Sequence, residues 1–170
     1  MGTLVPVYTI HSTKKLLDRV KQPVMPAVGD LTTALGNWYA TAIFWRLQVA
    51  FLVNEATLFP VLLTLAPATS IAARFPEALE SVLKVLGVNT AFIASERRAM
   101  SEASSSKTTN RSVLGVMNRL ELELDYLRDR VGETLLELSL YMSDHLVGPL
   151  RGTAFRTPQE KLMDVMRAQA

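Results

Sequence analysis

The fold is decided by residues 35–67, LGNWYATAIFWRLQVAFLVNEATLFPVLLTLAP, the most apolar stretch of the chain. Aromatic and β-branched residues are frequent in its segments 38–46, 48–54 and 58–65. Short segments of this composition between turn residues are typical of β-strands. The turns between them are short, so the stretch predicts an antiparallel meander that forms the centre of a sheet.

Helical periodicity dominates the rest of the chain. A short strand at residues 5–10 and a short helix at 14–20 precede the meander, and apolar residues then recur at helical spacing in 71–86, 90–103, 110–131 and 133–145. The polar run 104–108 fits either a strand or a loop. We therefore predict a single α+β domain over residues 1–147, an antiparallel sheet of three to five strands packed against four or five helices. Residues 148–170 are predicted to form a C-terminal tail with a short amphipathic helix.

The composition excludes several kinds of functional site and gives no support to some kinds of partner. The 170 residues include no cysteine, which excludes a disulfide framework, a thiolate nucleophile and a cysteine-ligated metal, and fits a cytoplasmic location. The net charge of +2 gives no support to nucleic-acid binding, for which the only local basic run is Lys14, Lys15, Arg19 and Lys21. No uncharged run resembles a membrane-spanning helix, so we expect no membrane association.

Four motifs resemble those of a known family in order and spacing: HSTKKLL at 11–17, LGNWYA at 35–40, LVNEATLFP at 52–60 and TTNRSVLGVMN at 108–118. They resemble an uncharacterised family of small bacterial proteins known only as a domain of unknown function. The resemblance implies a bacterial, cytoplasmic protein and transfers no activity. Cysteine often stands in that family where this chain has Ser12, and a serine nucleophile would need a general base that a thiolate would not.

Three residues are candidates for catalysis. Ser12 and Lys15 form a Ser-x-x-Lys pattern at a helix start, where the lysine could activate the hydroxyl, or Ser12 could simply cap the helix. His11 could be a general base, although neighbours on a strand point to opposite faces. Glu55 could be a general base or a metal ligand, or it could only close a turn.

Lys15 and two further groups are candidates for binding. Asn37, Trp38, Tyr39 and Asn54 lie at the ends of a predicted hairpin, where they could line a ligand site or serve as turn and core residues. The second group is Asn110, Arg111 and Ser112, which begins the strongest predicted helix. The free N–H groups of a helix start attract anions, and capping is the alternative explanation.

Two function classes follow from these residues. The first is a hydrolase of a small ester or lactone, in which Glu55, His11 or Ser12 activates water or attacks, the Arg111 region holds the oxyanion and a divalent metal ion assists. The second is a non-catalytic binding or regulatory module for a protein or a nucleic acid. A small-molecule ligand fits both classes, a homo-oligomer stays open, and no motif assigns a cofactor. Convergence of the candidate residues on one pocket would favour the enzyme.

Overall fold

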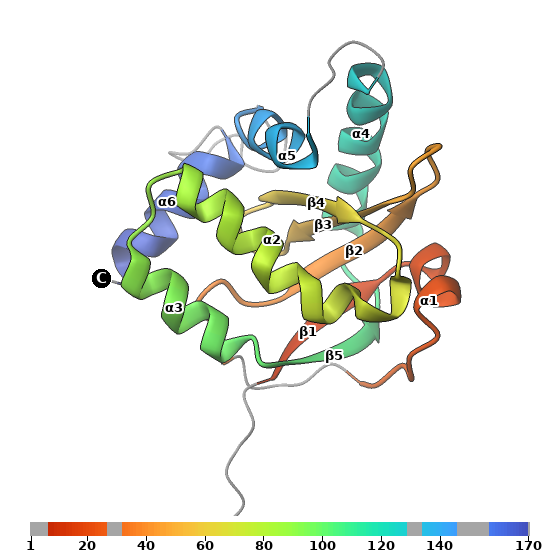
Figure 1. The fold of residues 1–170 in the computed structure, drawn as a ribbon, viewed down its shortest axis with the longest axis horizontal. Helices are drawn as coiled ribbons and strands as arrows, with labels where there is room; N and C mark the ends of the chain where they lie inside the picture. Colours follow the sequence, from red (N-terminus) through yellow and green to blue (C-terminus); the bar gives the residue numbers. More distant parts are fainter. Residues whose placement is uncertain (1–6, 27–31, 129–133, 146–156, 170) are drawn as a thin grey trace, which may run out of the picture.

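The computed structural model describes residues 7–26, 32–128, 134–145 and 157–169 (Figure 1). Its five strands form one sheet in the order β4-β3-β2-β1-β5. The strands are β1 (Val7–Ser12), β2 (Trp38–Ile43), β3 (Val49–Asn54), β4 (Pro60–Thr64) and β5 (Glu102–Lys107). The helices in these ranges are α1 (Lys14–Val20), the 3-10 turn η1 (Ala68–Ser70), α2 (Ile71–Val85), α3 (Thr90–Ala99), α4 (Arg111–Leu127), α5 (Leu135–Ser143) and α6 (Pro158–Ala168).

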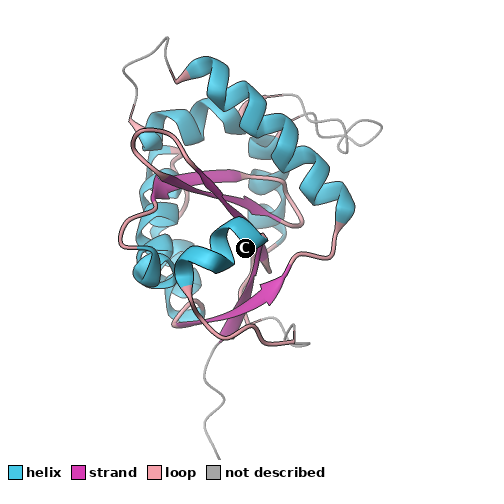
Figure 2. Ribbon diagram, turned by 90° about the vertical axis from the view of Figure 1, so that its right-hand side faces the viewer, coloured by secondary structure: helices cyan, strands magenta, loops and turns pink. Residues whose placement is uncertain are grey.

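The predicted meander is confirmed. β2 pairs antiparallel with β3, with Trp38 opposite Asn54, and β3 pairs antiparallel with β4, with Val49 opposite Thr64. Every residue of β2 and β3 is buried, which explains why their sequences are apolar without a clear alternation. Helices cover both faces of these strands (Figure 2).

The α+β class is confirmed, but the prediction of a purely antiparallel sheet is wrong. β1 lies parallel to both β2 and β5, so the sheet is mixed. A helical crossover separates each of these pairs in sequence: α1 lies between β1 and β2, and α2 and α3 lie between β2–β4 and β5. Such crossovers are what parallel pairing requires. Five α-helices of the described ranges, α1 to α5, lie within residues 1–147, in agreement with the four or five predicted there.

Successive residues of β2 point into two separate cores, because side chains alternate along a strand. Trp38 belongs to the core beneath α2, α3 and α6, which we call the α2 face, and Tyr39 belongs to the core beneath α4, which we call the α4 face. Figure 1 shows α2 and α3 crossing the sheet on one side. Helix α5 packs along β4 and contributes to both cores.

The ends of several helices differ from those predicted. The helix predicted at 90–103 stops at Ala99, since residues 102–107 form β5, which resolves the choice between strand and loop at 104–108. The helix predicted at 110–131 is α4, and its last residues, with the first of the helix predicted at 133–145, lie outside the described residues. The amphipathic helix expected in the tail is α6, whose Leu162 is fully buried in the α2-face core. Across the described residues, every helix is too short or too polar to span a lipid bilayer.

Candidate functional site

Asn54 organises the turn that joins β3 to β4. Its Oδ1 accepts hydrogen bonds from the backbone N–H groups of Ala56 at 3.1 Å and Thr57 at 2.9 Å, and its Nδ2 donates to the Leu35 carbonyl at 2.8 Å. The side chain is fully buried. An amide that closes its own turn in this way has a structural role, which was the alternative to ligand binding.

The neighbouring predicted residues also serve the sheet. The Asn37 Oδ1 accepts the Thr9 N–H at 3.0 Å, which links β1 to the start of β2. Trp38 is fully buried, with its ring centroid 4.8 Å from that of Phe75. The Glu55 backbone N–H donates to the Asn37 carbonyl at 3.0 Å, and within the described residues its carboxylate has no hydrogen bond or ion pair.

His11 and Ser12 lie on opposite faces of the sheet, as expected for neighbours on a strand. The His11 ring stacks on Tyr39 with centroids 4.7 Å apart, and its Nδ1 lies 3.0 Å from the Lys107 carbonyl oxygen. Ser12 instead lines a cavity of about 20 Å³ with core residues of the α2 face. Lys15 forms an ion pair with Glu121 at 3.6 Å, so the Ser-x-x-Lys pair does not meet in this structure.

The start of α4 is capped by its own side chain. Asn110 Oδ1 accepts the N–H groups of Ser112 at 3.0 Å and Val113 at 3.2 Å. The Asn110 N–H donates to the Tyr39 hydroxyl at 3.1 Å. Ser112 and Arg111 are exposed. Two of the helix N–H groups that an anion could use are therefore already occupied by the cap.

The structure thus brings together only some of the predicted site residues. His11, Tyr39 and Asn110 form one connected group on the α4 face. No hydrogen bond or ion pair joins Glu55 or Ser12 to this group in the described part of the chain. In the same ranges, no three His, Asp or Glu side chains are arranged so that they could hold a metal ion.

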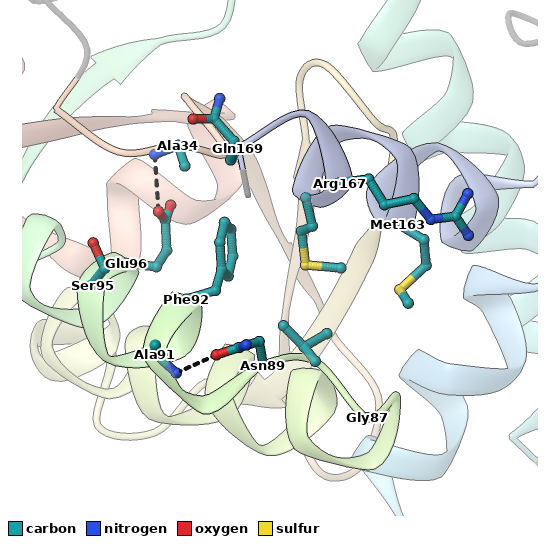
Figure 3. Close-up of a pocket in the computed structure, with 12 residues that line it drawn as sticks. Ala34, Gly87, Asn89, Ala91, Phe92, Ser95, Glu96, Met163, Arg167 and Gln169 are labelled. Atoms are coloured by element: carbon teal, nitrogen blue, oxygen red, sulfur yellow. Dashed lines mark hydrogen bonds between the residues drawn. The ribbon is translucent and has the colours of Figure 1, made fainter.

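A larger cavity lies where the sequence indicated no site. It measures about 510 Å³ and is bounded by α3, the turn before it, α6 and Ala34 (Figure 3). We call it the α3–α6 cavity. Its apolar lining consists of Ala34, Val88, Ala91, Phe92, Met163 and Met166, and its polar lining of Asn89, Ser95, Glu96, Arg167 and Gln169.

Glu96 is the one buried acid of this lining, with 3% of its surface exposed. Its carboxylate accepts the backbone N–H groups of Ala34 at 2.9 Å and Leu35 at 3.1 Å (Figure 3). Burial raises the pKa of the Glu96 carboxyl above its ordinary value, and the two backbone hydrogen bonds oppose that shift by favouring the charged form.

Sequence reasoning missed this cavity, although one signal was present. Glu96 follows Phe92 by four residues and precedes Met100 by four, so it falls on the inward face of the predicted helix. An acid at a position expected to be apolar indicates a special environment. No sequence pattern, however, connects this helix with α6, which supplies the opposite wall.

Comparison with known families gives one result. Residues 9–161 match the family model described as Domain of unknown function (DUF6933). The chain belongs to this family. The DUF6933 match contains all four sequence motifs and extends from β1 into α6, which confirms the resemblance that the motifs predicted. No match was found among the curated proteins.

Proposed function

We propose that the protein is a non-catalytic binding module whose ligand occupies the α3–α6 cavity. The observation that supports it best is the cavity itself, about 510 Å³ with a mostly apolar lining. Small-molecule sites have volumes of roughly 300–1,000 Å³ and are lined mainly by apolar side chains with a few polar groups. Within the described residues, the predicted catalytic residues Glu55 and Ser12, in contrast, take no part in a shared polar network.

The walls of the cavity come from separate parts of the chain, so a ligand inside it would contact both parts. Phe92 belongs to α3, whereas Met163 and Met166 belong to α6, far along the sequence. Figure 3 shows the labelled side chains of Phe92 and Met163 on facing walls. Methionine side chains are unbranched and adapt to irregular shapes. An apolar ligand between them would therefore add contacts that tie α6 to α3.

The resonances of the methionine methyl groups can be used to test this proposal. The chain has seven methionines, which can be labelled with carbon-13 and titrated with 1-octanol, a neutral apolar probe. We expect the resonances of Met163 and Met166 to shift, while those of Met117 and Met142 in the α4-face core stay in place. Shifts spread evenly over all of these residues would contradict the proposal, and so would the absence of any shift with octanol and with its amine and carboxylate analogues.

A matched pair of variants controls for indirect effects. Ala91→Trp places a bulky side chain in the α3–α6 cavity, and we expect it to abolish the methionine shifts. Ala94→Trp introduces the same side chain at another exposed position of α3. Ala94 lines a different cavity, which lies between α2 and α3. We expect Ala94→Trp to bind the probe as the unmodified protein does.

A hydrolase is the second candidate, and His11 is the observation that favours it. Its Nδ1 faces the Lys107 carbonyl, so the neutral ring carries its proton there and leaves Nε2 as an acceptor. Assays with activated esters and lactones, with and without a chelator, test this candidate. Turnover that survives His11→Gln, Ser12→Ala and Glu55→Gln would remove these residues as its catalytic groups.

We also propose that the protein is bacterial and cytoplasmic, which the motif resemblance and the absence of cysteine support. Fractionation of a host that expresses the tagged chain tests the location. A nucleic-acid partner has less support, because Lys14 pairs with Asp18 and Lys15 pairs with Glu121 in the basic run. A homo-oligomer stays a prediction that sedimentation analysis would test.

A further inference from the structure

The α3–α6 cavity contains a buried charge without a counter-ion. Within the described residues, the Glu96 carboxylate is bonded only to the backbone N–H groups of Ala34 and Leu35, and no lysine, arginine or histidine pairs with it. A buried carboxylate loses the solvation that water would give it, which is costly unless another group compensates. Buried acids are usually paired for this reason.

The carboxylate can accept more hydrogen bonds than the protein provides. Two carboxylate oxygens together offer about four acceptor positions. Each Glu96 oxygen takes one backbone N–H, so each keeps a free acceptor position. A donor that also carries a positive charge would satisfy both the hydrogen-bonding capacity and the missing counter-charge. An ammonium group has these two properties.

The rest of the lining defines the body of such a ligand. Phe92 contributes an aromatic ring to the wall next to Glu96, and Val88, Met163 and Met166 contribute aliphatic and thioether surface. A cation is attracted to the face of an aromatic ring. The remaining surface would be covered best by an alkyl or aryl group, because it offers few polar partners.

Arg167 raises the opposite possibility, an anionic ligand. Its side chain lines the cavity but is exposed, and Figure 3 shows it on α6 away from the labelled Glu96. Interactions of exposed charges are screened by water and contribute little. A carboxylate inside the cavity would also be repelled by Glu96. The buried charge therefore decides the ligand class, and Arg167 does not.

We propose that the α3–α6 cavity binds an apolar primary amine, with its ammonium group on the Glu96 carboxylate and its alkyl or aryl body against Phe92, Met163 and Met166. This inference rests on the proposed binding function and specifies its ligand. A single amine is expected, because the described lining offers one buried acid.

Three probes with the same alkyl chain test the headgroup: n-octylamine, 1-octanol and octanoate, compared by calorimetry at neutral pH. A hydrogen bond to a charged group changes affinity by about tenfold or more, so we expect octylamine to bind at least about tenfold more tightly than octanol. We expect octanoate to bind most weakly. Glu96→Gln should remove the advantage of octylamine over octanol, because the amide has no charge.

Glu77→Gln is the matched control, since it removes the same charge from an exposed position on α2. We expect it to leave the order of the three probes unchanged. If Glu96→Gln does not fold, octyltrimethylammonium replaces the variant, because it keeps the charge but has no N–H donor. It should bind less tightly than octylamine, and equal binding would overturn the proposed hydrogen bond.

The outcomes separate this inference from the function on which it rests. Equal affinities of octylamine and octanol, with shifts of the Met163 and Met166 methyl groups, would overturn the amine and keep the binding module. Tightest binding of octanoate, lost in Arg167→Gln, would also overturn the amine. If none of the probes shifts these methyl groups, both proposals fail.

Discussion

The neighbours Trp38 and Tyr39 point to opposite faces of the sheet, and their polar groups differ in whether they find a hydrogen-bond partner. On the α4 face, the Tyr39 hydroxyl is bonded by the Asn110 N–H at the start of α4. On the α2 face, the Trp38 indole N–H and the Tyr8 hydroxyl are buried without a partner in the described residues. Unsatisfied buried polar groups are rare in native proteins. Thr9, which points to the α4 face, also has a buried hydroxyl without a partner in the described residues, so the contrast holds for this pair of neighbours and not for each face as a whole.

This difference indicates where each face obtains its stability. The α4 face combines apolar packing with satisfied helix-cap hydrogen bonds. The α2 face depends on the burial of large apolar side chains, among which Phe75 contacts both Trp38 and Tyr8. A ligand that fills the cavity would add to the apolar burial on the α2 face and not to the hydrogen bonds on the α4 face. Mutations that remove one kind of contribution at a time can therefore test the comparison.

Phe75→Ala should have the largest effect. The side chain is fully buried, and its loss leaves a void between Trp38 and Tyr8. We expect the free energy of unfolding to fall by about 3–5 kcal/mol in urea denaturation, as for other buried aromatic residues. Phe44→Ala makes the same change at a half-exposed position and should cost less than about 1 kcal/mol. Similar costs at both positions would show that the α2 face does not depend on Phe75.

Removal of single hydroxyl groups should change the free energy of unfolding less than Phe75→Ala does. The direction of the change should differ between Tyr39 on the α4 face and Tyr8 on the α2 face. Tyr39→Phe leaves the Asn110 N–H without its acceptor, so we expect a loss of about 1–2 kcal/mol. Tyr8→Phe removes a buried hydroxyl that has no partner, and we expect no loss or a slight gain. Thermal and urea denaturation of both variants measure this contrast. A comparable loss in Tyr8→Phe would mean that its hydroxyl is satisfied in solution.

The pH dependence of Glu96 should be the smallest effect. Its folded-state pKa is raised by burial, so its contribution to stability is full below the unfolded pKa of about 4.3 and is lost as pH rises through the folded pKa. We therefore expect the stability of the protein relative to Glu96→Gln to increase as the pH is lowered from neutral toward 4.3. Glu77→Gln, which changes an exposed acid, should show no such trend. A relative stability that falls on acidification would contradict the sign of the shift.

Local patterns in the sequence were sufficient for most elements of the fold. The apolar strands β2, β3 and β4 and the helix α1 lie close to where composition and capping placed them. Strand β5, EASSSK, could not be separated from a loop, because an edge strand of small polar residues lacks the apolar alternation of a half-buried strand. The direction of β1 was also out of reach, since periodicity carries no information about which strands pair.

The site was harder to predict for the same reason. Asn54 and Asn110 were recognised as polar residues at turns and helix starts, but local sequence could not decide between capping and ligand binding, and the structure shows the caps. The α3–α6 cavity arises from the approach of helices that are far apart in the chain. Burial of Glu96 depends on that approach, so only its position on an inward helix face was visible beforehand.

The pairing of β1 with β5 has a consequence for how the chain folds. β2, β3 and β4 are joined by short turns and can assemble locally. In contrast, β1 pairs with β5, and the paired residues Val7 and Glu102 are far apart in the sequence. Closing so long a loop is slow relative to forming a hairpin. During synthesis, one edge of β1 therefore stays open until most of the chain has emerged, and an open edge invites pairing with other chains. Pulsed hydrogen exchange during refolding should show β5 amides protected after those of β3, and simultaneous protection would contradict this order.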